Sequence, residues 1–151
     1  MPIPTLQAGE LPSGEYVATL EEVEMTFGIQ NDRRKNLMSG LKVAVNQFQA
    51  ARVSFILIDG SFTTDKEDPA DIDGCWSASG DNIDETKIDP DFWNFKTPQE
   101  FQQCRQNIKN KYGLDFFVAE FIESGSGKPF SEFFKTNRDG YPKGILKIIL
   151  N

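Results

Sequence analysis

The stretch from Val53 to Trp76 constrains the fold of this chain more than any other part of it. It opens with a run rich in Val, Ile and Phe that is short enough for a buried strand and stops at Gly60-Ser61. After a polar connection of nine residues, the chain re-enters apolar sequence through Asp71-Ile72-Asp73. Residues two apart on an extended strand share a face, so we expect Asp71 and Asp73 to point the same way. The stretch therefore predicts a strand–turn–strand unit that carries two neighbouring carboxylates.

These two carboxylates indicate a cation. Adjacent carboxylates raise each other's pKa unless a positive ion holds both of them ionised. A hard divalent ion with oxygen ligands, Mg²⁺ or Mn²⁺, suits that task. The Gly60-Ser61 turn can offer backbone N–H groups and a hydroxyl to phosphate oxygens. Lys66, within the connection, could reach a triphosphate as a point charge or could face solvent. Together these features predict a site for phosphoryl or nucleotidyl transfer.

The same unit carries a family resemblance. A strand, Gly60-Ser61, a nine-residue connection and Asp71-x-Asp73 on a second strand resemble the signature of the DNA polymerase beta-like nucleotidyltransferase superfamily. The chain is most similar to its small bacterial members, the minimal nucleotidyltransferases and abortive-infection toxin-like proteins. The run from Gly60 to Asp73, with Leu11-Pro12-Ser13-Gly14 near the start, is similar to one bacterial branch. The resemblance implies an α+β fold, a mixed β-sheet backed by helices with a minimal nucleotidyltransferase-like core.

The resemblance also implies an activity and assigns roles to residues. A magnesium-dependent enzyme of this kind moves an NMP from an NTP to a hydroxyl of RNA or protein. Ser61 and the N–H groups near Gly60 would hold the β and γ phosphates. Asp71 and Asp73 would bind two Mg²⁺ ions, and Asp115, on a later strand, would hold the catalytic ion and help deprotonate the acceptor. A toxin–antitoxin or phage-defence module, with a partner protein or a homo-oligomer supplying acceptor recognition, is the biological setting that such relatives suggest.

The identity of the third carboxylate and of the phosphate-binding cations stays open at this level. Asp115 lies at the start of an apolar strand, where a carboxylate is unfavourable unless it is paired or metal-bound. Glu120 is the alternative, on the same expected strand but out of phase with Asp115, and Asp139 in a turn is a weaker one. Arg138 and Lys143 are candidates to touch phosphate or acceptor.

Other kinds of site are excluded by the residues present. The chain has no histidine, so it has no Ser-His or Cys-His pair and no His-ligated zinc. It has no Gly-Lys-Ser/Thr for a P-loop, and Asp71-Ile72-Asp73-Gly74 does not fit an EF-hand loop, since Pro69 and Gly80 fall where carboxylates are required. Two alternatives remain. The acidic stretch could be a solvated surface turn, or the protein could be a non-catalytic nucleotide-binding or antitoxin-like member of the same fold.

The rest of the chain reads as one domain over residues 1–151, with an extended lead-in at 1–15. Neither a membrane span nor a secretion signal is present, and two cysteines are too few for a disulfide framework, so a cytoplasmic protein is expected. The net charge is −7, with −10 in residues 1–104 and +3 in residues 105–151, and the basic part could face triphosphate or RNA. Caps and periodicity predict helices at 20–27, 32–51 and 98–112, a helical turn at 129–134, a polar loop from 77, and strands at 114–121 and 145–150.

Cations at the start of the second expected helix are unusual. Arg33, Arg34 and Lys35 oppose the helix dipole there. They hint at an anionic ligand nearby, although simple surface exposure is the commoner reason for such cations.

Overall fold

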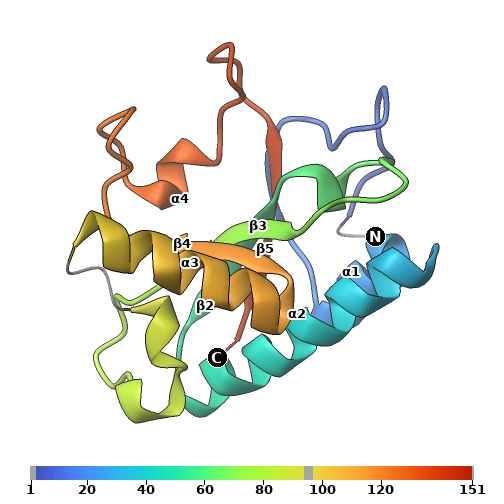
Figure 1. The fold of residues 1–151 in the computed structure, drawn as a ribbon. Coiled ribbons are helices and arrows are strands. Elements are labelled where there is room, and N and C mark those ends of the chain that lie inside the picture. The colour runs from blue at the N-terminus through green and yellow to red at the C-terminus, as the bar shows by residue number, and fades with distance from the viewer. Residues whose placement is uncertain (1–2, 94–96, 151) are drawn as a thin grey trace.

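A five-stranded mixed sheet forms the centre of the molecule (Figure 1). The computed structural model describes residues 3–93 and 97–150. The strands are β1 (Gly14–Val17), β2 (Phe55–Asp59), β3 (Ile72–Trp76), β4 (Leu114–Val118) and β5 (Gly144–Ile149), in the spatial order β1-β5-β2-β3-β4. β1 pairs with β5, and β3 with β4, in parallel, whereas β2 is antiparallel to both of its neighbours. The expected mixed sheet backed by helices is confirmed.

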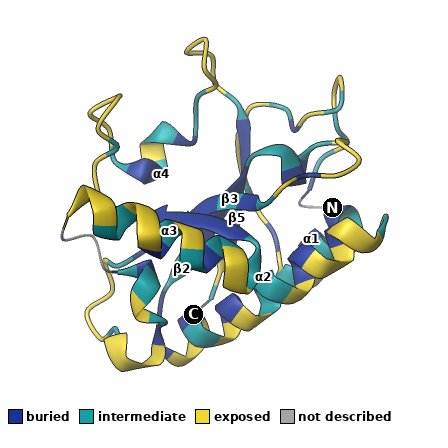
Figure 2. Cartoon of the chain, in the orientation of Figure 1, coloured by how far each residue is buried: buried dark blue, intermediate teal, exposed yellow. Residues whose placement is uncertain are grey.

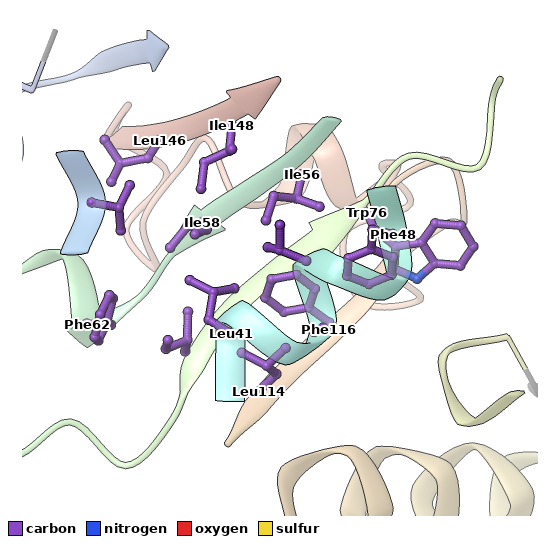
Figure 3. Packing of buried hydrophobic residues seen from close by; sticks show 14 of the residues in the cluster. Leu41, Phe48, Ile56, Ile58, Phe62, Trp76, Leu114, Phe116, Leu146 and Ile148 are labelled. Atoms are coloured by element: carbon purple, nitrogen blue, oxygen red, sulfur yellow. The ribbon is translucent and has the colours of Figure 1, made fainter. Parts of the chain in front are cut away.

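Alternation along the strands gives the sheet two different faces. One face packs on α1 (Leu20–Phe27) and α2 (Asp32–Ala50), and Figure 3 shows Leu41 and Phe48 of α2 meeting Ile56 and Phe116 of the sheet. The opposite face carries Leu57, Cys75, Phe117 and Ile145 and is covered by the short helix α4 (Phe130–Phe133). α3 (Pro98–Tyr112) runs beside β4, and its Ile108 and Phe101 join the first and second cluster respectively. The strands are mostly buried, whereas the helices alternate buried and exposed residues (Figure 2).

Side-chain caps explain why the helices begin where they do. Thr19 and Glu22 form the reciprocal capping box at the start of α1, at 3.1 and 2.9 Å. Asn31 and Thr97 accept the backbone N–H groups of Arg34 and Glu100 at the starts of α2 and α3. The predicted helices are therefore confirmed to within one residue.

Two expected boundaries are wrong. The strand predicted over 114–121 ends at Val118, because the Phe121 N–H bonds back to the Val118 carbonyl and turns the chain toward α4. The lead-in predicted over 1–15 is too long, since Gly14 and Glu15 already belong to β1 and pair with Gly144 and Ile145.

The later part of the segment after β3 is held to the core by its aromatic residues, whereas residues 79–82 in its first part are exposed, as a polar loop would be. It contains two short 3₁₀ helices, Glu85–Lys87 and Pro90–Phe92. Phe92 is buried, and the Trp93 ring meets the ring of Trp76 edge-on at 4.8 Å. Within the described parts of the chain, no helix is long and apolar enough to cross a membrane.

Candidate functional site

Three acids lie side by side on adjacent strands. Asp73 of β3 is the register partner of Asp59 on β2 and of Asp115 on β4. All three acids point to the face of the sheet that α4 covers, because each lies two residues from a strand residue of that face (Leu57, Cys75 or Phe117). Asp71, just before β3, completes the group, and one carboxylate oxygen each from Asp71, Asp73 and Asp115 lies within 4.8 Å of the others. The structure thus brings together the three acids that the sequence singled out.

Asp59 was not recognised from the sequence. It closes the apolar strand Phe55–Asp59 directly before Gly60-Ser61, and a carboxylate at the end of such a buried run is the signal that could have revealed it. The side chain is buried, and the Lys143 Nζ lies 2.6 Å from its Oδ2. Burial raises the pKa of Asp59, although Lys143 works in the opposite direction. Lys143, a predicted phosphate contact, is therefore already an ion-pair partner.

Asp73 is the acid with the least favourable surroundings. Burial, and then the neighbouring carboxylates of Asp71, Asp115 and Asp59, raise the pKa of Asp73 to about 7. Among the residues that the structure describes, no ion pair involves Asp73. A cation between these acids would remove the repulsion.

Two cations of α3 approach the same acids from the side. Arg105 donates from Nε and Nη2 to the two oxygens of Asp115, both at 2.8 Å. The Lys109 Nζ lies 3.8 Å from Asp115 and 3.9 Å from Asp71. Neither residue was predicted, although their spacing of four places both on one face of the helix that leads into Asp115.

The turn after β2 lies against Asp73. Gly60 has φ +82°, and a β-carbon at this position would stand 2.2 Å from the Asp73 Oδ2. Glycine is therefore required both for the backbone conformation and for the close approach. Ser61 follows at the start of a 3₁₀ turn, Ser61–Thr63. The predicted phosphate-binding turn and the acids are adjacent in space.

The connection from Phe62 to Ala70 is fixed by the arginines at the start of α2. The buried guanidinium of Arg34 donates to the carbonyls of Phe27, Phe62, Thr64 and Lys66. Arg33 donates to the carbonyls of Pro69 and Ala70. The suggestion that these cations face an anionic ligand is therefore wrong, because backbone carbonyls take their hydrogen bonds.

The other candidates fall in three different places. Lys66 is exposed and lines a cavity of about 420 Å³ beside α1 and α2, whereas Gly60 and Ser61 line a cavity on the side of the acids. Glu120 lies beyond β4 and accepts hydrogen bonds from the Ser77 hydroxyl and the Ala78 N–H, at 2.9 and 2.6 Å. The expectation that Glu120 lies on the same strand as Asp115 is therefore wrong. Asp139 is exposed in a turn.

Three cavities follow the row of acids. The first, of about 550 Å³, is lined by Gly60, Ser61 and Asp59. The second, of about 600 Å³, reaches from Gly60 to Asp73, and the third, of about 700 Å³, is lined by Asp73, Asp115 and the aromatic residues around α4. Arg138 lines all three, from the loop that rises between α4 and β5 (Figure 1). The cavities thus run from the polar turn at Gly60 past Asp73 to the aromatic residues around α4.

Comparison with known families gives one match. The sequence model of a family described as "Family of unknown function (DUF6932)" matches residues 4–149. No curated protein and no solved structure matches the chain.

Proposed function

This chain belongs to the DUF6932 family, and we propose from its own geometry that it is a magnesium-dependent nucleotidyltransferase. It would move an NMP from an NTP to a hydroxyl of RNA or protein. The observation that carries the proposal is the convergence of Asp71, Asp73 and Asp115 beside the tight turn at Gly60, where no described residue forms an ion pair with Asp73. A row of carboxylates next to free space for phosphate is the arrangement that phosphoryl-transfer chemistry requires.

The donor set fits a hard divalent ion. Oxygen ligands at about 2.1 Å from Mg²⁺ lie roughly 3–4 Å from one another, and the oxygens of Asp71 and Asp73, which lie within 4.8 Å of each other and of Asp115, can reach that spacing with small side-chain rotations. The donors are carboxylates alone, without sulfur or imidazole, which favours Mg²⁺ or Mn²⁺ over zinc. When bound, such an ion supplies positive charge against the triphosphate and its pyrophosphate leaving group.

The chain's own residues suggest which side each substrate occupies. On the Asp59 side, the N–H groups and hydroxyl at Gly60-Ser61 and the cations Arg138 and Lys143 suit phosphate oxygens. On the other side, Asp115 lines the aromatic cavity and can accept the hydrogen bond of an acceptor hydroxyl. The α-phosphorus would then lie near Asp73, which lines cavities on both sides and stands between donor and acceptor. Lys66 has no place in this arrangement.

Label transfer tests the proposal directly. The protein is incubated with each α-labelled NTP, Mg²⁺ and a mixed RNA or cell lysate, beside an Asp71→Asn/Asp73→Asn variant and an Asp81→Asn control. Asp81 is an exposed acid in a turn of the segment after β3, so its loss should leave transfer unchanged. Transfer by wild type and by the control, but not by the double variant, is the expected result. Equal labelling by all three proteins would refute the assignment of the site.

One observation favours a second candidate, a nucleotide-binding protein without catalysis. Asp115 is already neutralised by Arg105 and approached by Lys109, so fewer carboxylates are free than in a fully acidic centre. A protein of this kind, antitoxin-like or nucleotide-sensing, would bind an NTP with Mg²⁺ and transfer no label. Equilibrium binding of each labelled NTP beside the transfer assay distinguishes the two. If the protein is a transferase, a partner protein or a second copy would supply acceptor recognition, as in toxin–antitoxin and phage-defence modules.

A further inference from the structure

Arg105 forms hydrogen bonds to both carboxylate oxygens of Asp115. Its Nε and Nη2 each donate to a different oxygen at 2.8 Å, the bidentate geometry in which the guanidinium matches both oxygens at once. Asp115 is buried, with 8% of its side chain exposed, whereas 34% of the Arg105 side chain is exposed, so only the carboxylate side of this pair is shielded from solvent. A divalent ion that bound the same carboxylate would lie next to the fixed positive charge of Arg105 and would be repelled by it.

The arginine is also held in position from behind. The Arg105 guanidinium lies 5.3 Å from the centre of the Phe117 ring. Phe117 in turn stacks on Phe130 of α4 at 4.3 Å, with the two rings 8° from parallel. The backbone of Arg105 belongs to the regular helix α3. Displacement of this side chain by an ion would therefore break two hydrogen bonds and a packed ring contact together.

The balance of positive and negative side chains in the described part of the site also disfavours an ion at Asp115. Asp59 is paired with Lys143, and Asp115 and Asp71 are served by Arg105 and Lys109. With every carboxylate ionised, these three cations leave one net negative charge on the four acids, and Asp73 is the acid that has no ion pair among the described residues. The uncompensated negative charge is therefore at Asp71 and Asp73, away from Arg105.

We propose that Arg105 takes the place of a second divalent ion at Asp115, so that the nucleotide complex holds one ion, at Asp71 and Asp73, instead of two. The proposal rests on the proposed nucleotidyltransferase site and gives Arg105 the role of a positioning residue. Its side chain provides the positive charge on the acceptor side that the second ion would otherwise provide.

Electron paramagnetic resonance of bound Mn²⁺ tests the number of ions. The probe is Mn²⁺ with an α,β-methylene NTP, which cannot transfer its nucleotidyl group. Two Mn²⁺ ions about 3.5–4 Å apart are magnetically coupled, whereas one ion gives an isolated six-line spectrum. Wild type should give the isolated spectrum, and Arg105→Gln should give the coupled one. Lys87→Gln is the charge-matched control, because it removes one positive charge from an exposed side chain of the 3₁₀ helix Glu85–Lys87, outside the site; the spectrum of this variant should stay that of an isolated ion.

The other outcomes distinguish a failure of the Arg105 proposal from a failure of the proposed function. A coupled spectrum from wild type, or an isolated spectrum from folded Arg105→Gln, would overturn the role of Arg105 and leave the proposed function standing. If wild type bound no Mn²⁺–nucleotide at all, the proposed function itself would fail. Circular dichroism establishes whether Arg105→Gln is folded; if it is not, the wild-type spectrum alone decides, and Arg105→Lys, which keeps the charge, should resemble wild type.

Discussion

Replacing Arg34 with Met should destabilise the protein strongly, because the guanidinium is a buried donor to four carbonyls. The bonds to Phe27 and Phe62 are buried, at 3.0 and 2.8 Å, and those to Thr64 and Lys66 are partly buried, at 2.8 and 2.6 Å. Each buried carbonyl left without a donor costs about 1–3 kcal/mol. The partly buried carbonyls can regain water, and removal of a buried charge offsets part of the loss. We expect a net loss of about 2–5 kcal/mol.

Urea unfolding, followed by circular dichroism, measures this loss. The matched control is Lys35→Met, next to Arg34 but exposed, which should change the unfolding free energy by less than about 1 kcal/mol. Because the connection joins Gly60 to Asp71, folded Arg34→Met should also bind Mn²⁺ more weakly than wild type does. A loss below about 1 kcal/mol for Arg34→Met, with unchanged Mn²⁺ affinity, would refute the view that this arginine fixes the connection.

Three further predictions address the site and its surroundings. Asp73→Asn should raise the melting temperature of the metal-free protein by several degrees and abolish any rise on adding Mg²⁺, because it removes the carboxylate without a cation. Gly60→Ala should lower stability by at least about 1–3 kcal/mol in urea unfolding, through positive φ and contact with Asp73. Burial alone raises the pKa of Asp89, but hydrogen bonds from Tyr112 and Lys111 outweigh it and lower the pKa. Its stabilising effect should therefore be present above the unfolded pKa of about 4 and lost as pH falls through the folded value.

The controls for these predictions are simple. Asp81→Asn, an exposed acid, should leave both the melting temperature and the Mg²⁺ response unchanged. An Asp73→Asn protein less stable than wild type would mean that the carboxylate is already compensated. A Gly60→Ala variant as stable as wild type in urea unfolding would contradict the close approach of Gly60 to Asp73. For Asp89→Asn, the difference in unfolding free energy from wild type should shrink as the pH falls below about 4; a constant difference would exclude the ionised carboxylate as its source.

The helices were predictable because their signals are local. Thr19, Asn31 and Thr97 cap helices with their own side chains, within three residues of the donors that they accept. The strand–turn–strand unit was equally visible, because the apolar run, Gly60-Ser61 and the Asp-x-Asp pattern lie within one short stretch. These features need no knowledge of distant parts of the chain.

The missed features all depend on pairing between distant segments. The strand order that sets Asp59 beside Asp73 is a property of the whole sheet, so Asp59 could not be assigned from its neighbours in sequence. Arg34 finds most of its acceptors about 30 residues away, so its neighbours in sequence could suggest only an anionic ligand or surface exposure, and not these backbone carbonyls. Glu120 was placed on a strand because apolar residues continue to Phe121, although the chain turns after Val118 to reach α4.

The position of β5 has a consequence for synthesis of the protein. Of the five strands, β5 emerges last from the ribosome, yet it lies between β1 and β2. Until residues 144–149 are available, β1 has no neighbour and β2 has an open edge, and Asp59 lacks Lys143. A translation product that stops before this strand would expose unpaired edges of the kind that lead to aggregation and degradation. An intact acidic centre is therefore assembled only in chains that have been read through to β5.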